Sequence, residues 1–211
     1  MFDIDGTLVN SYKFDEECYL KAAEIVLEVK IPPNWEDYEN ATDAGILDEI
    51  IDRHKIPGRK NQIKKDFKKV FIELVSEYMG NNPHSVCEVE GAAYFIKYLR
   101  KHENCKVAIA TGSWEETAKR KLKAAGIDIR ECAFASSSDH HSRVNIMKSA
   151  EFMASSSIPF ITKTYFGDAS WDKKASEILN YRFILVGNGV KNKYQIENFK
   201  DIEAVLSILN L

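Results

Sequence analysis

Three short stretches of the sequence combine carboxylates, hydroxyls and glycines in patterns that could carry out chemistry. The first is Asp3-Ile4-Asp5-Gly6-Thr7, the second is Ala110-Thr111-Gly112-Ser113, and the third runs from Gly167-Asp168 to Asp172. Carboxylates can serve as nucleophiles, as general acids or bases, or as oxygen ligands of a divalent cation. Small hydroxyls and an open backbone at the start of a helix suit an anion.

Asp3 and Asp5 are separated by one residue, which would place their side chains on opposite faces of a flat strand. The two carboxylates converge only if the backbone turns at this point. Gly6 supplies the conformational freedom for such a turn.

The stretches lie where strands of a parallel sheet should end. Residues 1–8 form a strand stub that runs into a turn, and further strands are predicted at 107–110, 132–135, 165–166 and 183–186. Helices are predicted between and after them at 91–101, 115–125, 143–154, 170–179 and 202–209. This alternation predicts right-handed crossovers and an α/β fold with a parallel sheet, whose ligands bind beyond the carboxyl ends of the strands.

Residues 12–87 have a different pattern, with apolar residues at helical spacing throughout. Breaks come at Pro32-Pro33, at Pro57-Gly58 and at residues 80–83. We expect an all-helical block without a strand. The chain is thus predicted to be an α/β core that a helical insert splits after the first strand.

The three polar stretches, in this order along the chain, resemble the motifs of the haloacid dehalogenase (HAD) superfamily of phosphohydrolases. DxDGT followed by an apolar residue matches Asp3 to Leu8, an apolar strand ending in Thr matches Val107 to Thr111, and GDxxxD matches Gly167, Asp168 and Asp172. The resemblance implies a HAD-like Rossmannoid core of residues 1–11 and 88–211. It also implies that residues 12–87 form the helical class-one cap found in phosphoglycolate-phosphatase-like members.

The resemblance also implies a role for each motif residue. Asp3 would be the nucleophile that forms an aspartyl-phosphate, and Asp5 would be the general acid and base. Mg²⁺ would be held by the Asp3 carboxylate, the backbone carbonyl of Asp5 and Asp168, with Asp172 as a further ligand or as a residue that orients a metal-bound water. Thr111 would bind a phosphoryl oxygen, aided by backbone amides near Gly112. The presence of Asp5 favours a phosphatase, because the haloacid dehalogenases of the superfamily lack this carboxylate.

The superfamily also places one cation, usually a lysine, on the phosphoryl group. The candidates here are Arg143, Lys148 and Lys163. Arg143 is favoured because it opens a predicted helix at a spacing that fits the family, with Lys148 as the alternative. An arginine would depart from the usual lysine but can bind phosphate bidentately.

Several candidate residues have simpler explanations. Thr42 and Asp43, which we expect in a substrate-contacting loop of the cap, could merely cap a helix, as could Asp172. Ser113 could contact substrate or be the N-cap of the helix that carries Glu115. Asp139-His140-His141 resembles part of the DHH phosphoesterase pattern but is interpreted as a polar loop at the rim of the site.

Composition narrows the class of protein further. The chain of 211 residues has 29 basic and 32 acidic side chains and a net charge of −3, which argues against a nucleic-acid-coating role. No apolar run approaches 18 residues and no signal peptide is evident, so we expect no membrane segment. The four cysteines form no CxxC pair and are expected to be reduced thiols, which favours a cytoplasmic protein. Only two residues precede Asp3, so the central strand is expected either to be unusually short or to lack its beginning.

The predicted function is a Mg²⁺-dependent phosphatase that hydrolyses a small phosphorylated metabolite. Alternatives are a phosphomutase on the same scaffold and a non-catalytic binding protein with this fold. We expect a monomer or homodimer, and the sequence does not identify the substrate.

Overall fold

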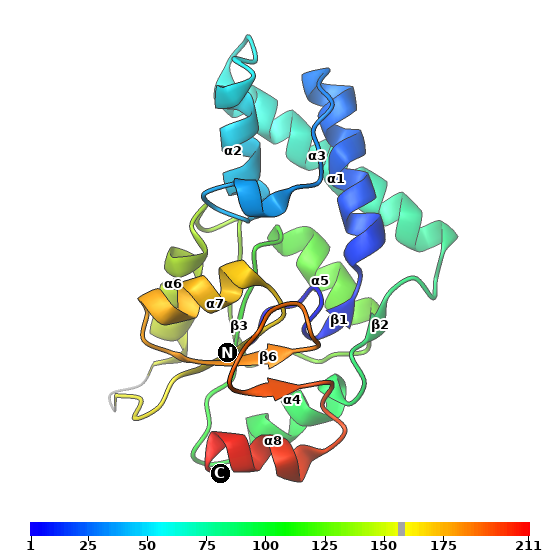
Figure 1. Ribbon diagram of the computed structural model, residues 1–211. Coiled ribbons are helices and arrows are strands. Elements are labelled where there is room, and N and C mark those ends of the chain that lie inside the picture. Colours follow the sequence, from blue (N-terminus) through cyan, green and yellow to red (C-terminus); the bar gives the residue numbers. More distant parts are fainter. Residues whose placement is uncertain (156–158) are drawn as a thin grey trace.

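The computed structural model describes residues 1–155 and 159–211. Its centre is a parallel sheet of short strands: β3 (Ala108–Ala110), β4 (Ala133–Ala135), β5 (Thr164–Gly167), β6 (Arg182–Val186) and β7 (Gln195–Ile196). β3 pairs with β4, and β6 lies between β5 and β7. The parallel α/β architecture predicted from the sequence is confirmed (Figure 1).

The N-terminal residues join the two halves of this sheet. Phe2 bridges in parallel to Ile109 of β3 on one side and to Phe166 of β5 on the other. Its backbone N–H donates to the Ala108 carbonyl, and the Asp3 N–H donates to the Phe166 carbonyl, both at 2.9 Å. The predicted stub therefore lies in the middle of the sheet, so that Asp3 emerges at the sheet centre.

The helices of the core cover both faces of the sheet. One face packs on α6 (Arg143–Ala154) and α7 (Ser170–Ile178), and the other on α4 (Ala92–Lys101), α5 (Glu115–Ala124) and α8 (Ile202–Leu209). Successive strand residues alternate between two hydrophobic clusters, as Tyr165 and Phe166 show. This alternation determines which layer of helices each strand side chain packs against.

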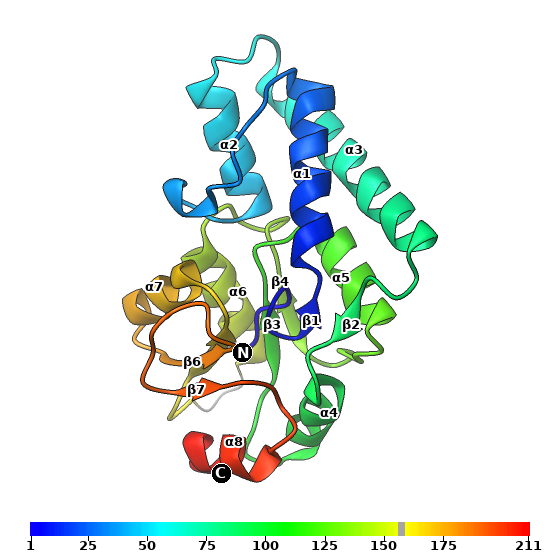
Figure 2. The ribbon, with the colours of Figure 1, turned by 45° about the vertical axis from the view of Figure 1, so that its right-hand side comes forward.

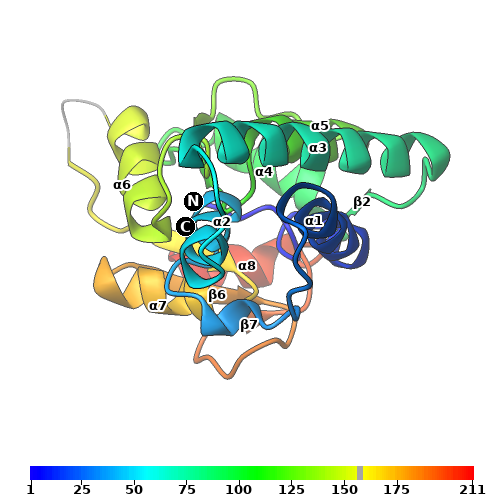
Figure 3. The same ribbon diagram turned by 90° about the horizontal axis from the view of Figure 1, so that it is seen from above.

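Three long helices stand over the carboxyl ends of the strands (Figures 1 and 2). They are α1 (Tyr12–Leu27), α2 (Asp43–Arg53) and α3 (Lys60–Asn81), with a short 3₁₀ helix, η1 (Trp35–Asp37), before α2. We call residues 12–81 the helical insert. Seen from above, α3 runs across the molecule while α1 and α2 are viewed nearly end-on (Figure 3).

The chain leaves and re-enters the core through a two-stranded antiparallel ribbon, β1 (Val9–Asn10) and β2 (Cys87–Glu88). The expectation that residues 12–87 contain no strand is therefore wrong at its last residue, because Cys87 pairs with Asn10. These strands and β7 have two residues each, too few to produce a periodic pattern in the sequence.

The insert is fastened to the core by an aromatic cluster. Trp114, which precedes α5, is buried with its ring 5.3 Å from Phe71 and 6.0 Å from Phe67 of α3, and 6.2 Å from Tyr19 of α1. Aromatic residues bury large apolar areas, so this cluster holds α1 and α3 against α5. Among the described residues, no helix has the length and hydrophobicity needed to cross a lipid bilayer.

One glycine of the core is required by its backbone. Gly91 has φ +85°, and a Cβ atom at this position would lie 2.7 Å from the carbonyl carbon and oxygen of Phe199. Only glycine combines this conformation with such a close approach of two backbone segments. Gly91 thereby sets the start of α4 against the segment that leads into α8.

Candidate active site

Three carboxylates meet where the strands end. Carboxylate oxygens of Asp3, Asp168 and Asp172 all lie within 4.8 Å of one another. Asp3 follows the central stub, Asp168 follows β5, and Asp172 lies in the first turn of α7. A Cβ atom on Gly167 would lie 2.6 Å from that of Asp172, so the glycine before Asp168 makes room for this cluster.

Arg143 is the cation beside Asp3. Its Nη1 lies 2.8 Å from Oδ1 of Asp172 and 3.4 Å from Oδ1 of Asp3. Nη1 also donates to the Tyr165 hydroxyl at 3.3 Å, while Nη2 donates to the Ala41 carbonyl at 3.1 Å. The guanidinium therefore links the first residue of α6 to the carboxylate cluster and to the helical insert.

The two lysine candidates lie elsewhere. Lys148 is exposed, and Lys163 forms an ion pair with Glu151 at 2.5 Å. Neither lines the cavity that contains Asp3. The geometry thus favours Arg143 over both lysines as the phosphate-binding cation, although its role stays a prediction.

The carboxylate cluster has the properties of a cation site. Burial raises the pKa of Asp3 to about 7 against the opposing effect of Arg143, and burial also raises the pKa of Asp172. Asp3 Oδ1 is buried and accepts no hydrogen bond from the described residues. Three carboxylates against one guanidinium leave an excess of negative charge in a low-dielectric site. Oxygen donors with this excess charge suit a hard divalent cation such as Mg²⁺.

The side chain of Asp5 points away from this cluster. Its carboxylate accepts hydrogen bonds from Ser113 Oγ at 2.7 Å and from Ser11 Oγ, and it forms an ion pair with Lys121 Nζ at 2.6 Å. Burial alone would raise its pKa, but Lys121 and the two hydroxyls reverse the effect and hold the pKa below its usual value. The expectation that the backbone carbonyl of Asp5 binds the metal stays a prediction.

The segment after β3 forms the wall of the site beside Arg143. Thr111 is buried, and its hydroxyl accepts a hydrogen bond from the N–H of Ser113 at 3.2 Å. A Cβ atom on Gly112 would lie 2.4 Å from Nη2 of Arg143, so a larger residue would displace the guanidinium from this position. Ser113 is not the N-cap of α5, as one interpretation proposed, because Trp114 occupies that position. Its hydroxyl contacts Asp5 instead.

The loop before α2 closes over this wall. Thr42 caps α2 by accepting a hydrogen bond from the Gly45 N–H at 3.1 Å, and it also lines the cavity. The Asp43 N–H donates to the Gly112 carbonyl at 2.8 Å, and the Asp43 carboxylate accepts from the Trp114 N–H at 2.7 Å. The capping and site interpretations of Thr42 are therefore compatible.

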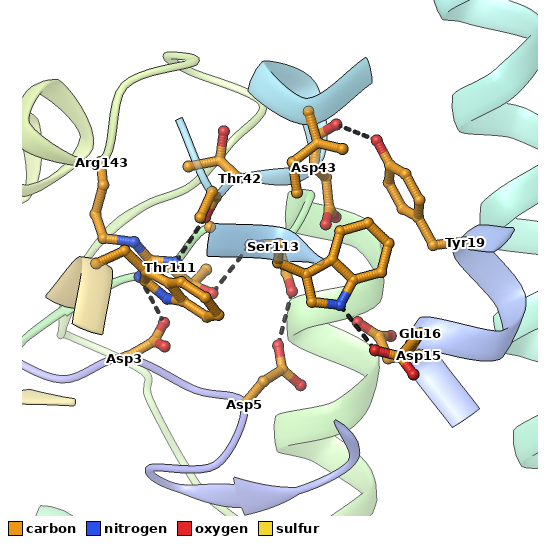
Figure 4. Close-up of a pocket in the computed structure, with 15 residues that line it drawn as sticks. Asp3, Asp5, Asp15, Glu16, Tyr19, Thr42, Asp43, Thr111, Ser113 and Arg143 are labelled. Atoms are coloured by element: carbon orange, nitrogen blue, oxygen red, sulfur yellow. Dashed lines mark hydrogen bonds and ion pairs between the residues drawn. The ribbon is translucent and has the colours of Figure 1, made fainter. Parts of the chain in front are cut away.

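These elements enclose a cavity of about 100 Å³ between the sheet and the insert (Figure 4). Figure 4 shows Asp3 and Arg143 on one side, Asp15 and Glu16 of α1 on the opposite side, and Asp5 between them. The remaining lining includes Trp35 of η1 and Trp171 of α7. Eight of the ten predicted site residues line this cavity, whereas Asp168 and Asp172 do not. The eight are Asp3, Asp5, Thr42, Asp43, Thr111, Gly112, Ser113 and Arg143.

Lys121 was not among the site residues predicted from the sequence. Its side chain is fully buried and forms ion pairs with Asp5 at 2.6 Å and with Asp15 at 3.2 Å. A signal was available, since Lys121 lies three residues after Ala118 and four before Ala125, on the apolar face of its helix. A lysine on a buried face indicates a buried acidic partner.

The histidines of residues 140–141 lie outside the cavity. His141 Nδ1 is 2.5 Å from an Asp48 carboxylate oxygen of α2, and His140 contacts Ser149. Neither residue belongs to the carboxylate cluster found among the described residues.

A parallel α/β sheet whose strand ends carry carboxylates and a cation has the architecture of an enzyme. The family model of the haloacid dehalogenase-like hydrolases matches residues 1–186, and the chain belongs to this family. The comparison with curated protein sequences finds no match.

Solved structures share the fold along nearly the whole chain. A hydrolase from Pseudomonas syringae is 19% identical with a TM-score of 0.75, and the match covers 99% of this chain and 97% of that one. The β-phosphoglucomutase of Clostridium difficile is 16% identical, with a TM-score of 0.74 and coverage of 99% and 95%. CbbY from Rhodobacter sphaeroides, solved in complex with phosphate, is 15% identical, with a TM-score of 0.72 and coverage of 95% and 94%.

Proposed function

We propose that this hydrolase is a Mg²⁺-dependent phosphatase that acts on a small phosphorylated metabolite through a covalent intermediate on Asp3. The observation that carries the proposal is the placement of the buried Asp3 carboxylate beside Asp168, Asp172 and Arg143 at the cavity between the sheet and the insert. A phosphate monoester repels anionic nucleophiles, so its hydrolysis requires charge neutralisation and alignment at one place.

The residues of the site have complementary roles in this proposal. A carboxylate oxygen of Asp3 attacks phosphorus as the ester P–O bond breaks, and the leaving oxygen takes a proton from Asp5. Asp5 then removes a proton from the water that attacks the aspartyl-phosphate, which releases phosphate and regenerates Asp3. The lowered pKa of Asp5 in the substrate-free site suits the proton-removing role. In the first step a phosphate dianion beside Asp5 raises this pKa by charge repulsion, so that Asp5 carries the proton it donates.

Arg143 and Thr111 position the phosphoryl group. The guanidinium of Arg143 already lies at the edge of Asp3, where it would neutralise the equatorial oxygens during transfer. Mg²⁺ held by Asp3, Asp168 and Asp172 would supply further neutralisation and orient the phosphoryl oxygens. The insert acts as the cap that excludes water, with Thr42 and Asp43 above the phosphoryl site.

Phosphate release from an aryl phosphate tests the proposal. We expect turnover with Mg²⁺, none with excess chelator, and a loss of at least about a hundredfold in Asp3→Asn, since removing a covalent nucleophile removes the reaction path. Folded, Mg²⁺-loaded protein without turnover would overturn the phosphatase and favour a binding role. Isomerisation of a sugar phosphate without phosphate release would instead identify a phosphomutase.

A further inference from the structure

The side of the cavity opposite Asp3 has an unusual set of charges. Asp15 and Glu16 of α1 line this side, with Asp5 between them and the phosphoryl site (Figure 4). Among the described residues that line the cavity, Arg143 is the single permanent cation, and Asp172 and Asp3 already engage it. Nothing in this lining offers a positive charge to the part of the substrate that leaves.

The buried lysine does not reverse this balance. Lys121 lies behind the cavity wall and pairs with both Asp5 and Asp15. The three carboxylates on this side belong to Asp5, Asp15 and Glu16, and the ammonium of Lys121 neutralises one of them. An excess of two negative charges remains, without counting the further carboxylate of Asp43. A leaving group with a carboxylate or a second phosphate would meet repulsion here that water screens only in part.

Aromatic rings accompany these carboxylates. The indole N–H of Trp35 donates to Glu16 Oε2 at 2.8 Å, which fixes the carboxylate relative to the ring. The Tyr19 ring lies edge-on to Trp35 at 5.6 Å, and Trp171 adds a third ring to the lining. A carboxylate held among aromatic rings is a combination that binds positively charged nitrogen, through ion pairing and cation–π attraction.

We propose that the alcohol released from the substrate carries a positively charged nitrogen, which Glu16 binds beside Trp35 and Tyr19. The inference rests on the proposed phosphatase function and names the substrate class for that site: phosphate monoesters of amino alcohols. The phosphoryl group lies on Asp3 and Arg143, and the cationic end lies across the cavity on α1. The site thereby rejects phosphate esters that carry a second anion.

Three esters of nearly equal size test this selectivity: 2-aminoethyl phosphate, 2-hydroxyethyl phosphate and phosphoglycolate. They differ at one end, which is cationic, neutral or anionic. We expect kcat/KM with Mg²⁺ to be highest for 2-aminoethyl phosphate and lowest for phosphoglycolate. An aryl phosphate measured in parallel reports the phosphatase activity independently of this end group.

The variant Glu16→Gln removes the charge and keeps an oxygen to accept from Trp35. We expect the ratio of kcat/KM for 2-aminoethyl phosphate over phosphoglycolate to fall about tenfold, because Glu16 is half-buried and solvent screens part of its charge. Glu17→Gln, an exposed neighbour on α1 that does not line the cavity, should leave this ratio unchanged.

The possible results separate the two proposals. Phosphoglycolate hydrolysed as well as 2-aminoethyl phosphate, or a ratio that Glu16→Gln leaves unchanged, would overturn the inference, while turnover of the aryl phosphate would retain the phosphatase. Failure of all four esters with Mg²⁺ would overturn the phosphatase and, with it, the substrate class.

Discussion

Lys121 offers a direct test of how the site is held together. Its ammonium group is fully buried and forms ion pairs with Asp5 of the core and Asp15 of the insert. Substituting Lys121→Met keeps a long apolar stem on α5 but leaves two carboxylates without their cation. Their side chains are 14% and 17% exposed, so water compensates little of the loss.

The expected cost follows from this burial. Removing one partner of a buried ion pair destabilises proteins by about 3–5 kcal/mol, because the remaining charge is buried and unpaired. For a chain of this length, each kcal/mol lowers the unfolding midpoint by roughly 2–4 °C. We therefore expect Lys121→Met to unfold roughly 6–20 °C below the parent protein at neutral pH.

The pH dependence has a definite sign. With Lys121 present, the lowered pKa of Asp5 contributes stability that is present above the unfolded pKa near 3.8 and lost below it. Burial raises the pKa of Asp15 to about 6, against the effect of Lys121. Without Lys121 both pKa values rise, so the variant loses stability as the pH increases through the range from about 4 to 7. The difference between the two proteins is therefore largest at neutral pH and shrinks toward pH 4.

Urea unfolding followed by tryptophan fluorescence at pH 7.5 and pH 5 measures this difference. Lys119→Met is a matched control on the same helix, since Lys119 is 52% exposed and pairs with the exposed Glu115. We expect this control to change the free energy of unfolding by less than about 1 kcal/mol. If Lys121→Met were as stable as Lys119→Met, or if its deficit did not depend on pH, the proposed role of the buried ammonium would be wrong.

Three further predictions concern the core and the site. Gly91→Ala should lower the free energy of unfolding by about 2 kcal/mol or more, whereas Gly126→Ala, with a similar φ of +72° but open space around its Cβ, should cost less; equal costs in urea unfolding would contradict the predicted clash with Phe199. Arg143→Lys keeps the charge but loses the fork that reaches Asp172 and the Ala41 carbonyl together, so kcat/KM for an aryl phosphate should fall about tenfold or more; unchanged kinetics would refute that role. Mg²⁺ should raise the thermal midpoint of the parent protein by mass action but not that of Asp168→Asn, and an equal rise in both would place the metal elsewhere.

The sequence predicted those features that depend on local pattern. Strand and helix alternation, together with three polar stretches at strand ends, predicted the parallel sheet and the edge at which Asp3, Asp168 and Asp172 meet. Gly126 follows α5 with φ +72°, as expected for a residue that ends a helix. These predictions succeed because each depends on residues close together in the chain.

The features that escaped prediction depend on packing between distant segments. Spacing alone ranked Arg143 above Lys148, and only the fold shows that one lies beside Asp3 and the other on the surface. The pair of Lys121 and Asp15 joins α5 to α1 across 106 residues, so no local pattern reveals it. No local pattern shows that Trp35 lines the cavity either.

The basic segment of residues 55–69 is, by contrast, a feature that a local sequence pattern does predict. Its seven basic residues and one acidic residue, on a helix with an apolar stripe, predict a solvated basic face or a charge that steers an anionic substrate. Lys60 and Lys64 pair with Asp48, and Lys68 pairs with Glu116 of α5. None of these lysines lines the cavity. The pairs with Asp48 join α3 to α2 within the insert, and the pair of Lys68 and Glu116 joins the insert to the core.

Covalent capture of the phosphoryl group tests the central claim most directly. Asp5→Asn slows the second half of the reaction, so acid quenching after incubation with an aryl phosphate and Mg²⁺ should trap the intermediate. We predict a phosphorylated tryptic peptide of residues 1–13 whose phosphoryl group hydroxylamine removes, as it does from an acyl phosphate, and no such peptide in the double variant that also carries Asp3→Asn. Phosphate release by the single variant Asp3→Asn at the rate of the parent protein would contradict the assignment of Asp3 as the nucleophile.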